Sequence, residues 1–496
     1  MTFRRFLKEA LLFILPAIGL VVSGCGGSAQ KKDNTLGGPI LAVGEADPTF
    51  AETGVALNNF DQSPFSRVSG RVVLNAPGGK YVVVASLNNT SLVAYRFNSD
   101  GSLDTTFGAD AHPADGKLDG FIMFDLTGLG IQNQSPHRAA FDSSGRITIA
   151  GDVNLGMGEQ MAVWRLLGTG QMDTTFGGDA FPADGTPDGF AIFTSPAGGN
   201  IYAYGRGLAI DSVGRILVAG SGSSPEPGWD MVLWRLTSSG TLDPTFGGDV
   251  NPADGQPDGF FFHHNAGGGN SQDHARDVVT DASGNILVSG YSFAGLSDLA
   301  VVLWRLTPTG LLDTTFNGKG WVSYNYGTGY DIASDMALTE NGDILITGFV
   351  TNSDYDMVVY RFKPNGLLDP NFGEDLYPVD GTPDGFIIRS NGGQENDQKL
   401  IFDPFGNIVL SQNLGASAFQ VYRFTPDGQG DPEFGQDLYP ADGIPDGFIQ
   451  ITETGGAGGG DQGFANTVDP LGRILVTGES LDMTNLWFDL GLWRFR

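Results

Sequence analysis

The chain has 496 residues, of which 75 are glycine and one is cysteine, and its formal net charge is −30. Such a negative chain repels phosphate backbones, which excludes direct nucleic-acid binding and makes cations the expected partners. Frequent glycine and aspartate indicate many tight turns between short strands, and a single cysteine excludes a disulfide framework. These totals favour an all-β protein.

The first residues have the pattern of an export signal. Arg4, Arg5 and Lys8 precede an apolar stretch at residues 10–22, which is too short for a comfortable membrane span. The tetrapeptide that ends at Cys25, Val-Ser-Gly-Cys, resembles the lipobox of bacterial lipoproteins.

That resemblance implies cleavage before Cys25 and lipidation of its thiol. We therefore expect a signal peptide at residues 1–24, a flexible tether carrying the lipid at residues 25–40, and a folded domain at residues 41–496. Residue 26 is glycine and not the aspartate that retains some lipoproteins in the inner membrane. The lipobox thus implies a cell-envelope protein held in a membrane by its lipid anchor, with the outer membrane or cell surface favoured.

An aromatic-Arg-apolar triplet recurs seven times in the rest of the chain. Its arginines are Arg96, Arg165, Arg235, Arg305, Arg361, Arg423 and Arg494. Successive arginines are 56 to 71 residues apart, which suits a propeller blade of roughly 40–50 residues enlarged by insertions.

Each triplet has further strand signals on both sides. Upstream, two short apolar runs flank a glycine-containing turn, as at residues 138–151. Downstream, an Asp-x-x-Phe turn such as residues 104–107 precedes another apolar run. Each repeat is therefore predicted to be a four-stranded antiparallel sheet, which is the unit of a β-propeller.

The two ends of the chain complement each other. The seventh copy stops at Arg496 without an Asp-x-x-Phe turn, and that element occurs instead at residues 47–50. We therefore expect a seven-bladed β-propeller whose last blade combines residues 461–496 with residues 42–60. Closure by the N-terminal strand would leave no open edge between the first and last blades.

The repeat resembles the delta-60 repeat, a bacterial family predicted to form propellers. The resemblance rests on the glycine hairpin followed by Lys or Arg and an apolar strand, on the Tyr/Trp-Arg pair and on Leu-Asp-x-x-Phe-Gly, and it covers nearly the whole chain after the tether. The sixth copy departs from it, with Gly430 in place of the leucine before Asp431. The resemblance implies a fold and no settled activity.

Each triplet arginine has a matching aspartate in an Asp-x-x-Phe turn. These aspartates are Asp104, Asp173, Asp243, Asp313, Asp369, Asp431 and, for Arg494, Asp47. We expect one structural Arg–Asp pair in each blade, locking the turn between the third and fourth strands. A ring of these arginines holding an anion in the channel is the disfavoured alternative, because they precede that turn and do not line the innermost strand.

Five repeats insert an acidic loop after Phe-Gly, each with three aspartates. They are Asp110, Asp115 and Asp119; Asp179, Asp184 and Asp188; Asp249, Asp254 and Asp258; Asp375, Asp380 and Asp384; and Asp437, Asp442 and Asp446. The Asp-Gly-x-x-Asp core is similar to part of the calcium loops of dockerin-type and FG-GAP repeats, which implies Ca²⁺ as a possible cofactor. The alternative is a tight solvent-exposed turn built by Asp, Gly and Pro.

No unique catalytic constellation is visible. The chain lacks a Gly-x-Ser-x-Gly elbow, and its carboxylates recur as repeats, whereas catalysis needs an asymmetric set. His263, His264 and His274 match no helical zinc motif and are expected at the surface. We expect a monomeric binding or scaffolding propeller, not an enzyme, that recognises a protein or glycan; the alternative is an envelope hydrolase or lyase on the same scaffold.

Overall fold

The computed structural model divides the chain into two units, Met1–Leu41 and Ala42–Arg496. It describes residues 45–58, 66–110, 116–156, 158–179, 185–194, 202–223, 228–249, 255–269, 272–295, 298–327, 329–351, 355–376, 381–390, 398–415, 418–435, 437, 446–452, 460–482 and 487–496. The predicted signal peptide, Cys25 and the tether therefore lie outside the described residues. Within the described part, no helix is long and apolar enough to cross a membrane.

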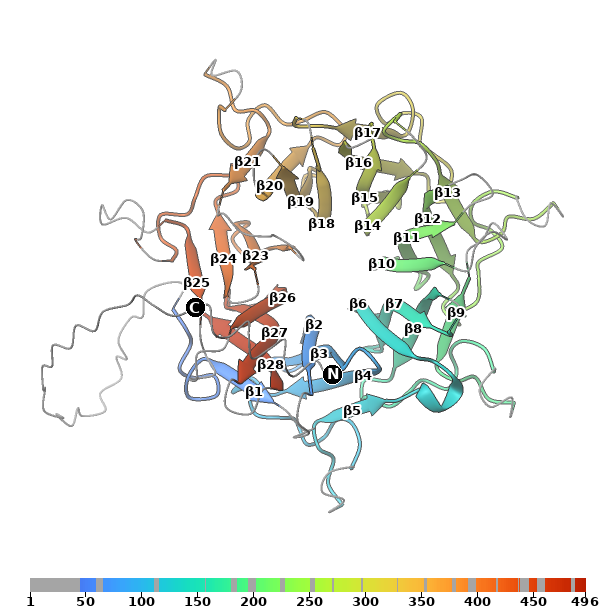
Figure 1. The fold of residues 1–496 in the computed structure, drawn as a ribbon, viewed down its shortest axis with the longest axis vertical. Coiled ribbons are helices and arrows are strands. Elements are labelled where there is room, and N and C mark those ends of the chain that lie inside the picture. The colour runs from blue at the N-terminus through green and yellow to red at the C-terminus, as the bar shows by residue number, and fades with distance from the viewer. Residues whose placement is uncertain are drawn as a thin grey trace, which may run out of the picture. The chain divides into compact units, whose positions relative to one another are not determined.

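The second unit is a ring of seven four-stranded antiparallel sheets (Figure 1), which confirms the predicted seven-bladed propeller. Blade one contains β2 (Val68–Ala76), β3 (Lys80–Leu87), β4 (Ser91–Phe97) and β5 (Phe121–Phe124). Blade two contains β6 (Asn133–Phe141), β7 (Ile147–Asn154), β8 (Glu159–Leu166) and β9 (Phe190–Phe193). Blade three contains β10 (Ala203–Ile210), β11 (Ile216–Ser223), β12 (Trp229–Leu236) and β13 (Phe260–His263). A 3₁₀ helix, η1 (Thr127–Leu129), follows β5.

Blades four to seven continue the same order from the inner strand outward. Blade four contains β14 (Asp273–Thr280), β15 (Ile286–Phe293), β16 (Leu299–Leu306) and β17 (Trp321–Tyr324), and blade five contains β18 (Ile332–Leu338), β19 (Ile344–Thr351), β20 (Tyr355–Phe362) and β21 (Phe386–Arg389). Blade six contains β22 (Lys399–Phe402), β23 (Ile408–Leu414), β24 (Ala418–Phe424) and β25 (Phe448–Ile451). Blade seven contains β26 (Asp461–Val468), β27 (Ile474–Asp482), β28 (Trp487–Phe495) and β1 (Val55–Asn58).

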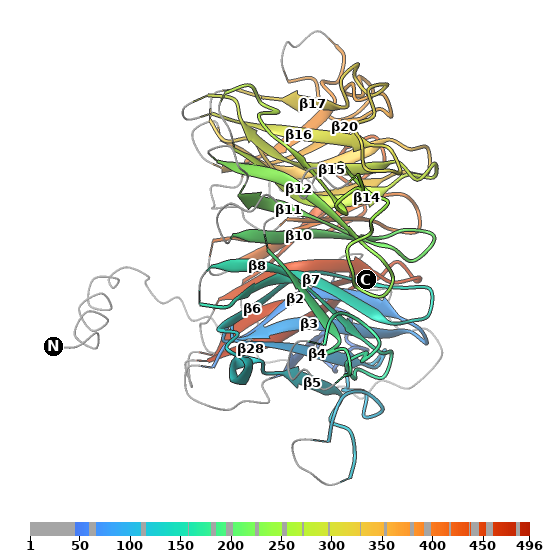
Figure 2. The same ribbon diagram turned by 90° about the vertical axis from the view of Figure 1, so that its right-hand side faces the viewer.

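The middle strands of each blade are buried on both faces because neighbouring sheets pack against each other. In β16 every residue except Arg305 is buried, so the strand reads as a continuous apolar run and not as an alternating pattern. The side view shows successive sheets stacked in this way, with loops projecting from both faces (Figure 2). The core is accordingly divided into seven apolar clusters.

The N-terminal strand closes the ring, as expected. β1 pairs antiparallel with β28 over Val55–Asn58, and Val55 lies opposite Trp493. Just before β1, the Asp47 amide donates to the Arg494 carbonyl at 2.8 Å and the Arg494 amide donates to the Gly54 carbonyl at 2.9 Å. Both extremities of the propeller therefore belong to one sheet, and the hydrogen bonds between them close the ring.

Six inner strands carry a β-bulge near their middle. The strand register shifts between Gly70 and Val72, Pro136 and Arg138, Gly205 and Gly207, Ala275 and Asp277, Ala333 and Asp335, and Gly463 and Ala465. A bulge leaves one residue out of the ladder and re-aims its side chain. The bulges thus set which side chains enter the central channel.

Candidate functional site

Each triplet arginine contacts the aspartate expected for it. The Arg Nε to Asp Oδ2 distances are 2.5 Å for Arg96–Asp104, 2.7 Å for Arg165–Asp173, 2.8 Å for Arg235–Asp243, 2.8 Å for Arg305–Asp313, 2.7 Å for Arg361–Asp369, 2.6 Å for Arg423–Asp431 and 2.9 Å for Arg494–Asp47. Burial works to raise the pKa of Asp243, but hydrogen bonds from Thr245 and the Arg235 charge outweigh it and lower that pKa.

The same arginine also joins neighbouring blades. Arg235 lies 4.2 Å from the centroid of Phe246 and donates from Nη1 to the Pro308 carbonyl of blade four at 2.5 Å. Phe246 in turn lies under Gly310 of that blade, where an added Cβ would come within 2.5 Å of the ring. Gly310 has a φ of +86°, so both its backbone conformation and its lack of a side chain suit this joint. None of the triplet arginines is among the residues that line the channel cavity described below.

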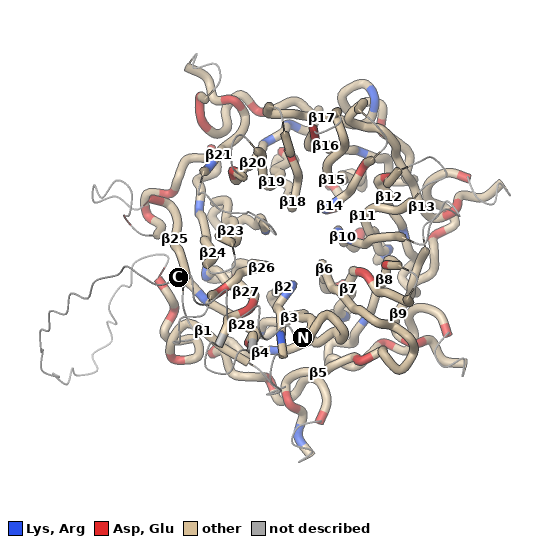
Figure 3. Tube along the Cα trace, in the orientation of Figure 1, with Lys and Arg blue, Asp and Glu red and all other residues tan. Residues whose placement is uncertain are grey.

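The acidic loops lie on the outer rim, where Figure 3 shows most of the red acidic segments. In four loops the first aspartate accepts a hydrogen bond from the glycine amide six residues later: Asp110 from Gly116, Asp179 from Gly185, Asp249 from Gly255 and Asp375 from Gly381, at 2.6–2.8 Å. In the same loops the amides of the third aspartates, Asp119, Asp188, Asp258 and Asp384, donate to backbone carbonyls across the loop. These contacts are those of a closed turn.

The other predicted calcium residues are placed only in part. The middle aspartates, Asp115, Asp184, Asp254, Asp380 and Asp442, lie outside the described residues. Asp437 and Asp446 of the sixth copy are described without the loop between them. Among described residues, no group of three His, Cys, Asp or Glu side chains is placed to hold a metal ion.

The three clustered histidines have separate partners. His263 Nδ1 accepts from Trp304 Nε1 at 3.3 Å, His264 Nδ1 lies 2.8 Å from Asp230, and His274 Nδ1 lies 2.9 Å from the Ser221 hydroxyl. Burial lowers the pKa of His263 to about 4 and that of His274 to about 3. The expected surface location holds only in part, because these two rings are partly exposed and pack among aromatic side chains.

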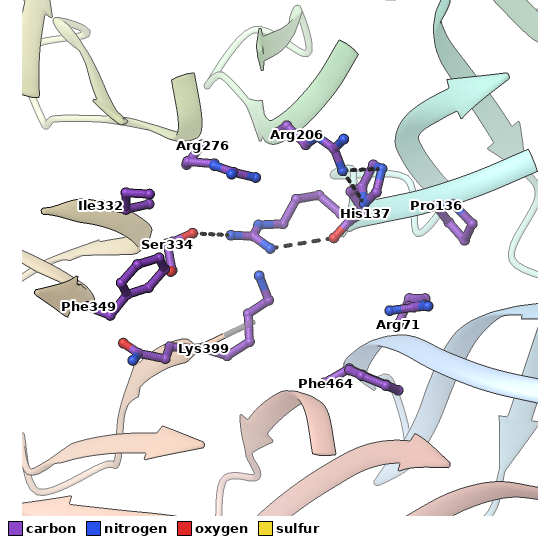
Figure 4. Close-up of a pocket in the computed structure, with 12 residues that line it drawn as sticks. Arg71, Pro136, His137, Arg206, Arg276, Ile332, Ser334, Phe349, Lys399 and Phe464 are labelled. Carbon is purple, nitrogen blue, oxygen red and sulfur yellow. Dashed lines mark hydrogen bonds between the residues drawn. The ribbon is translucent and has the colours of Figure 1, made fainter. Parts of the chain in front are cut away.

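The central channel holds a cluster of cations that the repeat motifs do not contain. A cavity of about 330 Å³ is lined by Arg71, Arg138, Arg206, Arg276 and Lys399, together with His137 (Figure 4). None of its twelve described lining residues is acidic. The net charge predicts cationic partners for the chain as a whole, yet the channel has the opposite local charge, because the carboxylates are concentrated on the rim (Figure 3).

One of these cations is neutralised by contacts across the channel. Arg138 of blade two bonds through Nη2 to Asp335 of blade five, and its Nε lies 3.4 Å from Asp277 of blade four. Both aspartates also accept backbone amides of the next inner strand, Asp277 from Met336 at 3.1 Å and Asp335 from Leu400 at 2.7 Å. Arg138 therefore ties three blades together and contributes little free positive charge.

Arg206, Arg276 and Lys399 are less compensated than Arg138. Arg206 lies 3.5 Å from Asp152, which also contacts His137 at 2.8 Å. Burial, and then the charge of Arg206, lower the pKa of His137, so this ring is neutral near pH 7. No described carboxylate forms an ion pair with Arg276 or Lys399. The channel thus presents guanidinium and ammonium groups to a ligand with little internal neutralisation.

Four segments match the model of a family described as "Domain of unknown function (DUF5122) beta-propeller". They are residues 77–107, 214–246, 282–316 and 339–372, and each ends at the phenylalanine of an Asp-x-x-Phe turn. The matched DUF5122 segments therefore contain the second and third strands and the arginine joint, whereas Arg71, Arg138, Arg206, Arg276 and Lys399 all lie outside them.

Two of the solved structures that resemble the chain do so at low sequence identity. A polysaccharide lyase, Uly1, has a TM-score of 0.46 and 11% identity, with coverage of 86% of this chain and 90% of that one. Drosophila Plexin A in complex with Semaphorin 1b has a TM-score of 0.41 and 7% identity, with coverage of 91% and 88%. No curated protein matches the sequence. Function is therefore argued from the residues of this chain.

Proposed function

We propose that this propeller is an envelope-anchored binding protein that holds an anionic ligand in its central channel. The observation that carries the proposal is a cavity lined by Arg71, Arg206, Arg276 and Lys399 besides the paired Arg138, and by no described acidic side chain, in a chain of net charge −30. The lipobox-like sequence that ends at Cys25 supports the anchor. A binding role also fits the placement of the site, because the repeated motifs serve the blade joints, whereas the residues at the bulges differ from blade to blade.

Arginine suits such a site because its planar guanidinium forms paired, charge-assisted hydrogen bonds to carboxylate, sulfate and phosphate groups. Arg206 and Arg276 come from equivalent bulge positions on neighbouring inner strands, β10 and β14. Both side chains point into the channel cavity (Figure 4). Anions as large as sulfate or a sugar carboxylate can therefore reach them from the channel.

We expect sulfate to stabilise the full-length protein against thermal unfolding and the double variant Arg206→Gln/Arg276→Gln to lose most of that effect. Each lost charge-assisted hydrogen bond is worth about 1.5 kcal/mol or more, so affinity should fall about 100-fold. Thermal melts at constant ionic strength, with sulfate replacing chloride, measure the effect. Sulfate also stabilises proteins nonspecifically, and the double variant reports that contribution.

The matched control is Arg389→Gln, which removes one positive charge on the outer strand β21, where Arg389 pairs with Glu374. This variant should keep the full response to sulfate. Equal stabilisation of the wild type and the double variant would show that the channel does not bind the anion.

A further inference from the structure

Aromatic side chains gather at one place beside the channel. Trp229 lies 5.3 Å from Tyr204 and 6.1 Å from His274 between ring centroids, and His274 stacks on Tyr291 at 4.8 Å. We call Tyr204, Trp229, His274 and Tyr291 the aromatic shelf. The shelf lines a second cavity of about 220 Å³ between blades three and four.

The shelf breaks the sevenfold pattern. Tyr204 and His274 lie on inner strands, opposite Ser221 and Tyr291. At the same position, the other described inner strands have Ser69, Ser135, Ile332 and Gln462, none of them aromatic. Blade five has aromatic residues at the positions of Tyr291 and Trp229, namely Phe349 and Tyr355. The aromatic residues at the inner-strand position, Tyr204 and His274, belong to one sector, whereas the blade joints recur seven times because they hold the ring together. A feature confined to one sector of a repeat protein is better explained by a ligand than by the architecture.

The aromatic shelf adjoins the two arginines of the proposed anion site. Arg206 and Arg276 line both cavities. The Arg206 Cζ lies 5.2 Å from the centroid of Tyr204, and the Arg276 Cζ lies 5.3 Å from that of Tyr291. These contacts hold each guanidinium at the border between the shelf and the channel. An apolar surface and a fixed pair of cations are therefore presented side by side.

Polar groups border the same surface. Ser221 lines the second cavity and bonds to His274 Nδ1, and the Tyr204 hydroxyl lies 3.4 Å from the Glu159 carboxylate. A pyranose ring has an apolar C–H face that packs on aromatic rings, and an edge of hydroxyls that need donors and acceptors. A uronic acid adds a carboxylate, which is the group that a pair of arginines recognises.

We infer that the aromatic shelf, with Arg206 and Arg276, forms a subsite for one uronic acid residue of an acidic polysaccharide. In this arrangement the sugar ring packs on the shelf and its carboxylate faces the two guanidinium groups. The inference rests on the proposed anion-binding function and adds the chemical class of the ligand.

Isothermal titration of the full-length protein with a galacturonate trimer tests the inference, with a galactose trimer and inorganic sulfate as comparison ligands. We expect the galacturonate trimer to bind at least tenfold more tightly than either. Trp229→Ala should weaken galacturonate binding at least tenfold and leave sulfate binding unchanged. Tyr330→Ala, which removes an exposed aromatic outside the shelf, is the control and should bind as the wild type does.

The outcomes separate the two proposals. If sulfate binds in an arginine-dependent way but Trp229→Ala binds galacturonate like the wild type, the uronic acid subsite is wrong and the anion site stands. Tighter binding of the galactose trimer than of the galacturonate trimer would also overturn the subsite, in favour of a neutral sugar. If neither sulfate nor galacturonate depends on Arg206 and Arg276, the proposed function itself fails.

Discussion

A chain that begins at residue 59, without the closing strand, is expected not to fold cooperatively. Removing β1 and the preceding turn leaves Arg494 buried without Asp47, a loss of about 3–5 kcal/mol. It also removes Phe50, which is fully buried, at a further cost of about 3–5 kcal/mol. Together these losses approach the whole stability of a typical domain, about 5–15 kcal/mol. Circular dichroism melts should show no cooperative transition.

A synthetic peptide of residues 45–58 provides the control for this truncation. Because β1 joins the sheet through backbone hydrogen bonds to β28, the peptide added in trans should restore part of the transition, whereas a scrambled peptide should not. A truncated chain that melts like the intact one would mean that the seventh blade is stable without its fourth strand.

Replacing Arg235 by methionine is expected to lower the free energy of unfolding by about 3–5 kcal/mol, because Asp243 would remain as an unpaired buried charge. The exposed fractions of the two side chains are 2% and 7%. The substitution also removes the contact with Phe246 and the hydrogen bond to the next blade. Urea unfolding measures the change.

Arg389→Met is the matched control for Arg235→Met. Its ion pair with Glu374 is partly exposed, with fractions of 28% and 29%, and surface pairs contribute only about 0–1 kcal/mol. Similar small effects of both substitutions would show that the triplet arginine is not a structural joint of the ring.

The fold could be predicted because the residues that build it are local and repeated. Arg235, Asp243 and Phe246 lie within twelve residues of one another, and the same local arrangement recurs in the first six blades. The seventh repeat lacks an Asp-x-x-Phe turn at its own end, and the matching turn begins at Asp47 near the other end of the chain. Counting complete repeats therefore predicts that the N-terminal strand closes the ring.

The channel could not be predicted in the same way. Arg206 and Arg276 are single residues in inner strands, and only the bulges decide that their side chains face the channel. A weak signal existed, because an arginine follows a small residue in the middle of several inner-strand runs, as in Gly205-Arg206-Gly207. The net charge indicated cationic partners, because it adds the many carboxylates on the rim to the few cations inside the ring.

The aromatic shelf has no linear signature. Trp229 and His274 belong to different blades and meet only when β12 and β14 pack side by side. Nothing in either repeat marks them, since each occupies a position that holds other residue types elsewhere in the ring. Residues that depart from the repeat are recognised only after the repeat has been placed in three dimensions.

The most direct test of the central claim is a crystal structure of the protein grown with selenate, whose selenium is located by anomalous scattering. The claim that the channel binds anions predicts a selenium peak within hydrogen-bonding distance of the Arg206 and Arg276 guanidinium groups. Selenate bound only on the outer surface, with none in the channel, would contradict it.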